Sequence, residues 1–174
     1  MRGWIERLVP LLAVLAAGCG VGDIAVSPSP TPILQTHTEQ IKVFGSAVIA
    51  VEEQRDSVVV LHQKLTANMM NMSTREVFAT TDELAKRQDN LRAKMVRIST
   101  PSNEIGAVHA AFSVAYMTEL EAYKTLASSV RSGDLTRMQA SVSGIMKAED
   151  FYGIAYEQLA DLLATVGLDM GDVR

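Results

Sequence analysis

The sequence predicts an all-α protein built as an up-down-up-down antiparallel four-helix bundle. Apolar residues recur every three or four positions in four stretches between residues 41 and 166, which is the period of an amphipathic helix. The five prolines stand at positions 10, 28, 30, 32 and 101, so helix breakers are rare after residue 32. Strand signals are scarce, because no alternating β-branched run is bounded by Asn-Gly or Asp-Gly turns. Four such helices joined by short turns pack best as a bundle, to which we assign residues 32–174.

The first helix is predicted to start at Thr31-Pro32, where an N-cap residue precedes a proline suited to the first helical position. Eight of ten seam positions in this stretch are apolar, as in a coiled coil. These positions hold Ile41, Phe44, Val48, Val51, Arg55, Val58, His62, Leu65, Met69 and Met72. We expect a helix of about 40 residues, longer than its partners and about 60 Å long.

Cap signals separate the other three helices. Residues 73–76 read Ser-Thr-Arg-Glu, the spacing of a capping box, so a second helix should begin there. Thr100-Pro101 repeats the cap-then-proline signal and should open a third helix. Gly133-Asp134 supplies a helix stop followed by a new N-cap. The apolar stripes that follow these signals run over residues 77–98, 105–130 and 135–166.

Length and net charge indicate a single domain and argue against a nucleic-acid-binding protein. A chain of 174 residues with 48% hydrophobic composition suits one domain with a sizeable core. Its formal net charge is −4, and without residues 1–18 it is about −5, from 14 basic and 19 acidic residues. Sequence-independent nucleic-acid binding needs a basic surface, so we expect no nucleic-acid partner.

The N-terminal segment has the pattern of a secretory signal. Arg2 and Arg7 precede an apolar run of about ten residues, too short to span a hydrocarbon core, and small residues follow it. Residues 15–19 read Leu-Ala-Ala-Gly-Cys, which resembles the lipobox of bacterial lipoproteins, although Ala16 stands where leucine is commonest. The resemblance implies that residues 1–18 are removed and that Cys19, the single cysteine, carries lipid. The alternative is an ordinary cleaved signal with an incidental cysteine.

The resemblance also implies a place in the cell. A mature bacterial lipoprotein carries several acyl chains, which hold it firmly to a membrane. We therefore expect a cell-envelope protein, on the outer face of the cytoplasmic membrane or on the outer membrane where two are present. Residues 19–31 alternate Ser and Pro toward their end, which favours an extended tether, the alternative being an arm packed on the bundle.

Three seam positions hold charged or titratable residues instead of apolar ones: Arg55, His62 and Glu149. In an antiparallel bundle Arg55 and Glu149 lie at the same height, and Glu119 on the third helix joins them. His62 lies at the height of Gln88 on the second helix. A paired polar layer sets the register of the helices, whereas the sharper hypothesis is a cavity that holds a small molecule or metal.

Motifs for cofactors and catalysis are absent from the sequence. A di-iron bundle needs Glu-x-x-His, which does not occur, and the three histidines stand far apart. No Gly-x-Ser-x-Gly, phosphate loop or second cysteine is present. We expect no cofactor and no enzyme activity.

Three further groups of residues allow two interpretations each. Met69, Met70 and Met72 suit a copper(I) site, but Met69 and Met72 continue the first seam and methionine commonly fills cores, so we assign the cluster to the core. The basic run at residues 86–97 suits an anionic lipid or acidic partner, and equally a solvated helix face. The four tyrosines of the third and fourth stripes should lie in the core with their hydroxyls at the bundle edge. The leading hypothesis is a non-enzymatic lipoprotein that binds an envelope protein.

Overall fold

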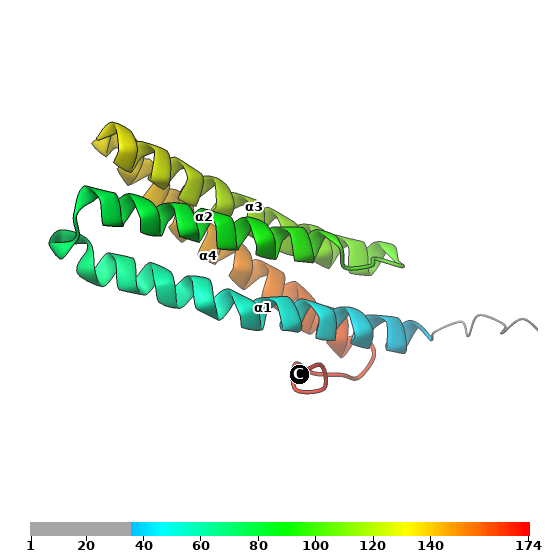
Figure 1. The fold of residues 1–174 in the computed structure, drawn as a ribbon. Helices are drawn as coiled ribbons and strands as arrows, with labels where there is room; N and C mark the ends of the chain where they lie inside the picture. Colours follow the sequence, from blue (N-terminus) through cyan, green and yellow to red (C-terminus); the bar gives the residue numbers. More distant parts are fainter. Residues whose placement is uncertain (1–35) are drawn as a thin grey trace, which may run out of the picture. The chain divides into compact units, whose positions relative to one another are not determined.

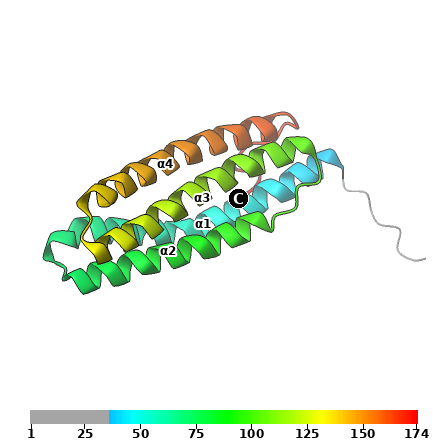
Figure 2. The same ribbon diagram turned by 90° about the horizontal axis from the view of Figure 1, so that it is seen from above.

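A computed structural model describes residues 36–174, and their four long helices confirm the predicted four-helix bundle. These are α1 (His37–Asn68), α2 (Thr74–Val96), α3 (Asn103–Ser132) and α4 (Leu135–Ala164), with a short 3₁₀ helix, η1 (Met69–Asn71), after α1. The helices run alternately in opposite directions (Figures 1 and 2). The predicted signal peptide, Cys19, the tether and the helix start at Thr31-Pro32 lie outside the described residues.

Side-chain caps explain where the helices begin. The Thr36 hydroxyl accepts a hydrogen bond from the Glu39 backbone N–H at the start of α1. The capping box predicted at residues 73–76 is present, with both reciprocal bonds formed. The predicted start of α3 at Thr100-Pro101 is two residues early, because Ser102 caps the helix by accepting a bond from the Ile105 N–H. Either position leaves the connection to α2 short, so the antiparallel topology is unaffected.

The turn between α3 and α4 follows the sequence prediction. Gly133 has φ 69°, the left-handed conformation that glycine adopts without a Cβ clash, and it ends α3. The Asp134 side chain then accepts the Arg137 N–H and starts α4. This turn lies at the same end of the bundle as η1 (Figure 2).

The end of α1 differs from the predicted seam. The helix stops at Asn68 and tightens into η1, so Met69 and Met70 are exposed and Met72 is half-buried. The interpretation of these methionines as core residues is therefore wrong for Met69 and Met70. Because α1 no longer covers α4 here, Val142 of the fourth stripe is exposed as well.

The core lies between all four helices, and each of the four stripes contributes large apolar side chains to it. Helices α3 and α4 pack together most extensively, whereas α1 meets α4 over a short stretch. Beyond α4 the C-terminal segment returns to α1, where buried Val173 packs on Gly45. A Cβ at Gly45 would lie 2.9 Å from Val173 Cγ1, so glycine permits this approach. Residues 35–174 form a compact unit of their own.

Candidate functional site

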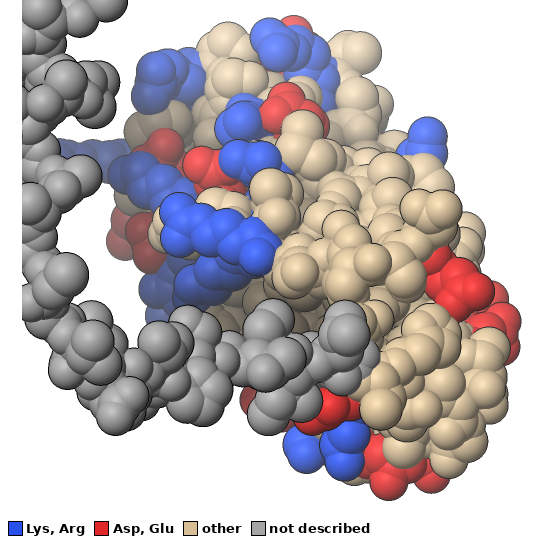
Figure 3. Space-filling model, turned by 90° about the vertical axis from the view of Figure 1, so that its right-hand side faces the viewer, with Lys and Arg blue, Asp and Glu red and all other residues tan. Residues whose placement is uncertain are grey.

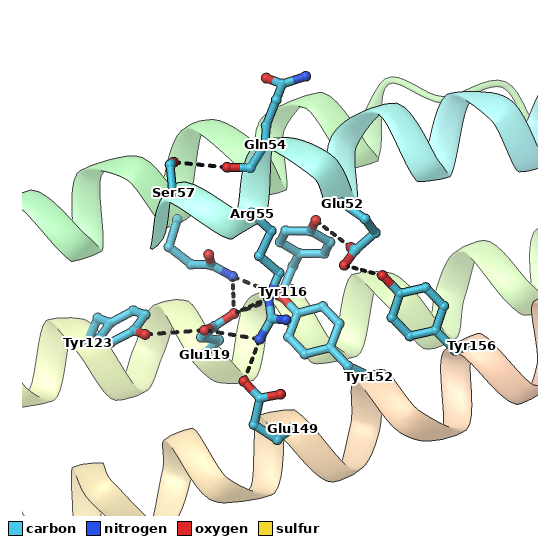
Figure 4. Close-up of polar contacts among 11 residues, drawn as sticks. Glu52, Gln54, Arg55, Ser57, Tyr116, Glu119, Tyr123, Glu149, Tyr152 and Tyr156 are labelled. Carbon is cyan, nitrogen blue, oxygen red and sulfur yellow. Dashed lines mark hydrogen bonds and ion pairs between the residues drawn. The ribbon is translucent and has the colours of Figure 1, made fainter. Parts of the chain in front are cut away.

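A layer of polar side chains crosses the middle of the apolar core, and every helix contributes to it (Figure 4). Hydrogen bonds and ion pairs join its members directly. We call these residues the polar layer: Glu52 and Arg55 from α1, Gln88 from α2, Tyr116, Glu119 and Tyr123 from α3, and Glu149, Tyr152 and Tyr156 from α4. On α1, α3 and α4 consecutive members are three or four residues apart, the spacing that places them on one face of the helix.

The centre of the polar layer is the ion pair between Arg55 and Glu119. Arg55 Nε lies 3.2 Å from Glu119 Oε2, and Nη2 lies 3.4 Å from Oε1, so the pairing is bidentate. The same Nη2 donates to Glu149 Oε1 at 2.6 Å. The guanidinium also stacks on Tyr152, with Cζ 3.6 Å from the ring centroid. Arg55 therefore joins three helices through one planar group.

Glu119 is held by more than its salt bridge. Its Oε2 also accepts bonds from Gln88 Nε2 at 2.7 Å and from the Tyr152 hydroxyl at 2.8 Å, and its Oε1 accepts one from Tyr123. A buried carboxylate is stable only when donors satisfy its lone pairs, and these donors come from α1, α2, α3 and α4. The carboxylate thus positions every helix relative to the others.

Glu52 forms a second centre beside the first. Its oxygens accept hydrogen bonds from the Tyr116 hydroxyl at 2.5 Å and the Tyr156 hydroxyl at 2.8 Å. The Tyr116 and Tyr152 rings meet edge to face, with centroids 5.3 Å apart, which connects the two centres. Both carboxylates are buried, whereas Glu149 is on the solvent side of the layer.

Burial and pairing shift the titration of these groups in different directions. Burial raises the pKa of Glu52 above its ordinary value, and the hydroxyls of Tyr116 and Tyr156 counteract this only in part. Burial is the largest single influence on Arg55 and would lower its pKa, but Glu119, Tyr152 and Glu149 together outweigh it and the pKa rises, so the guanidinium stays charged. Burial, with the carboxylates adding to it, raises the pKa of Tyr152, which keeps this phenol a neutral donor.

The structure brings together three of the four residues singled out from the sequence. Arg55, Glu119 and Glu149 are in direct contact, whereas His62 lies outside the bonded group and meets Tyr123 ring to ring, with centroids 5.8 Å apart. His62 Nδ1 is buried without a hydrogen-bond partner among residues 36–174. It reaches the polar layer only through that aromatic contact.

Sequence reasoning missed Glu52 and the direction of the tyrosine hydroxyls. The sequence places Glu52 beside Glu53 and outside the apolar seam, which predicts two exposed carboxylates, yet only Glu53 is exposed. Its position next to Val51 was the available signal, because a four-helix bundle buries a broader stripe than a two-stranded seam. The hydroxyls of Tyr116 and Tyr152 were expected at the bundle edge but bond to carboxylates inside the core.

The polar layer is hydrogen-bonded almost throughout. Its carboxylate, guanidinium and phenol groups bond to one another, and Gln88 Oε1 is its one buried side-chain oxygen without a partner in the described part of the chain. Within residues 36–174, no group of three His, Cys, Asp or Glu side chains is placed to hold a metal ion. The arrangement is suited to fixing helix register rather than to receiving a ligand.

A second feature is an apolar cleft at the end of the bundle formed by η1 and the α3–α4 turn. The cleft has a volume of about 450 Å³ and contains three methionine side chains, Met69, Met72 and Met138. We call it the methionine cleft; its other lining residues include Val77, Leu126, Val130 and Val142. Close to it in the chain, Met70 is 95% exposed and Leu135 is also exposed. Flexible thioethers suit a surface that adapts to an apolar partner.

Comparison with models of protein families, with characterised proteins and with solved structures found no match for this chain. None of the helices described in residues 36–174 is long and apolar enough to cross a membrane.

Proposed function

We propose that this protein is a lipid-anchored lipoprotein of the cell envelope whose bundle binds another protein without catalysing a reaction. The lipobox-like segment at residues 15–19 supports the anchor. The methionine cleft supports the binding role, and it is the single observation that carries it. Exposed apolar groups that gather around a cleft mark interaction surfaces, whereas scattered ones need no explanation.

The position of the cleft fits this role. The chain from Cys19 joins the bundle at Thr36, the start of α1, while the methionine cleft is at the end of α1 and the start of α4. The cleft would therefore face away from the point of attachment and be open to an envelope protein. An amphipathic helix with an apolar face is the partner that a cleft of this lining fits best.

The dense hydrogen bonding of the polar layer supports a structural role for Arg55, Glu119 and Glu149 rather than small-molecule or metal binding. A ligand would have to displace bonds that the layer already forms. A rigid register in turn keeps the cleft-forming ends of α1, α3 and α4 in place, which limits the entropy lost on binding.

The anchor is tested by expressing the full chain in a bacterium and labelling it with an alkyne-tagged fatty acid. We expect the label and the membrane localisation to be lost in Cys19→Ala. Labelling that persists in this variant would contradict the anchor.

The binding role is tested with a photo-crosslinking amino acid at position 70, where the side chain is exposed beside the cleft. We expect a discrete adduct in the envelope that V142E abolishes and V60E leaves intact. The two substitutions are matched, because Val142 lines the cleft and is 51% exposed, while Val60 on α1 is 63% exposed and does not line the cleft. If V142E and V60E reduce the adduct equally, or if the protein with neither substitution forms no adduct, the binding role is refuted.

A further inference from the structure

The end of the bundle at which α1 begins carries a pocket with two cationic side chains. This pocket, of about 410 Å³, lies between the first turns of α1 and the connection from α2 to α3. Its lining combines the apolar Val43, Phe44 and Ile98 with Lys94 and Arg97. We call it the tether-end pocket, because the chain from Cys19 joins the bundle four residues before Gln40, another of its lining residues.

Lys94 and Arg97 differ from the rest of the basic run on α2. The other three members are each paired with an acidic residue of the same helix: Lys86 with Asp82 at 2.8 Å, Arg87 with Glu83 at 2.7 Å, and Arg92 with Asp89 at 3.1 Å. Lys94 instead donates to the neutral side-chain amide of Gln54 on α1. Arg97 has no acidic partner within residues 36–174. Within the basic run at residues 86–97, the two cations without an ion pair are thus the two that line the pocket.

The charge around this end is asymmetric. Figure 3 shows most of the Lys and Arg side chains on one side, with acidic side chains among them, next to a broad area without charged side chains. The acidic Asp161 belongs to α4, which lies across the bundle from α2, and Asp169 and Asp172 belong to the segment that returns from α4 to α1. An anionic surface would attract the α2 side and repel the α4 side, so electrostatics would select one orientation.

We propose that the tether-end pocket docks on a membrane of anionic phospholipid. Lys94 and Arg97 contact the lipid phosphates, and the exposed Val43 with Ile98 enters the boundary between headgroups and acyl chains. The proposal rests on the proposed function in one respect, which is that lipid on Cys19 holds the bundle at a membrane.

The length of the chain between anchor and bundle supports this occupant. Cys19 and Thr36 are 17 residues apart, which reaches about 60 Å at most when fully extended. A tether of this length keeps the pocket at a high effective concentration over the lipid, so a weak contact is sufficient. The methionine cleft is at the opposite end of the helices and is left free for a protein partner.

The test uses residues 35–174, which form a compact unit, so its result does not depend on lipid at Cys19. Flotation with vesicles of phosphatidylcholine is compared with vesicles that also contain phosphatidylglycerol. We expect binding to the anionic vesicles alone, and its loss at high salt. Each basic residue near an anionic surface raises the membrane partition coefficient about fivefold, so K94Q/R97Q should lower this coefficient about 25-fold.

The matched control is R75Q/R137Q, which removes the same charge from exposed positions at the opposite end of the bundle. We expect it to bind nearly as well as the unsubstituted bundle, and circular dichroism verifies that each variant is folded. Equal loss in the two variants would show an effect of net charge and overturn the proposal, as would equal binding to neutral vesicles or no binding at all. A failure of Cys19 labelling would contradict the anchor and leave this result standing.

Discussion

Replacing Arg55 with Met removes the cation at the centre of the polar layer while leaving a side chain of similar length. Glu119, whose side chain is 2% exposed, then keeps its negative charge in the core without a counter-ion. Breaking a buried pair by removing one partner costs about 3–5 kcal/mol. Glu119 retains donors from Gln88, Tyr152 and Tyr123, so we expect the lower end, a loss of about 3 kcal/mol in the free energy of unfolding.

The loss is measured by urea denaturation at neutral pH, followed by far-ultraviolet circular dichroism, with an unchanged dependence on denaturant. R55M/E119Q should be more stable than the sum of the two single changes predicts, by about 1 kcal/mol or more, because the neutral amide needs no counter-ion. E149Q is the control. Because the Glu149 side chain is 56% exposed, this substitution should lower the free energy of unfolding by less than about 1 kcal/mol. A stability of R55M within about 1 kcal/mol of the unsubstituted protein would refute this account of the layer.

Two further predictions concern Glu52 and Gly133. Because burial raises the pKa of Glu52 in the folded protein above its ordinary value of 4.5, its stabilising contribution is complete below that value and is lost as pH rises through the higher folded-state pKa. The stability of E52Q relative to the unsubstituted protein should therefore increase with pH, measured by urea denaturation at several pH values; a constant difference would contradict the raised pKa. G133A places a Cβ at φ 69° and should cost about 1 kcal/mol, seen as a lower thermal midpoint, whereas G153A in a regular turn of α4 should not destabilise. A higher midpoint for G133A would show that the α3–α4 turn tolerates another conformation.

The helices themselves follow from local sequence signals. The capping box at residues 73–76 and the Gly133-Asp134 turn satisfy backbone groups through neighbours only a few residues away, so their effect is visible without tertiary structure. The apolar period of 3.6 likewise identifies the buried face of each helix. Short connections then leave antiparallel packing as the simple solution.

The packing of one helix against another decided the rest. Aligning the helices end to end in an antiparallel bundle places Arg55 at the height of Glu149. The bidentate bond to Glu119 also depends on which helices are neighbours and on how each is rotated about its axis. Glu52 looks like a surface residue beside Glu53 until the hydroxyls of two other helices meet it.

At the two ends of the bundle, too, the sequence determines the residue types and the tertiary structure determines their contacts. The sequence alone identifies Met69 and Met72 as apolar seam positions, and it identifies Lys94 and Arg97 as part of a basic run. The structure ends α1 at Asn68, so that Met69 and Met72 line a cleft. It pairs the other three basic side chains of the run with acidic residues of α2. The physical reason is range: caps and periodicity act within a few residues, whereas clefts and unpaired charges depend on the distances between side chains that are far apart in the chain.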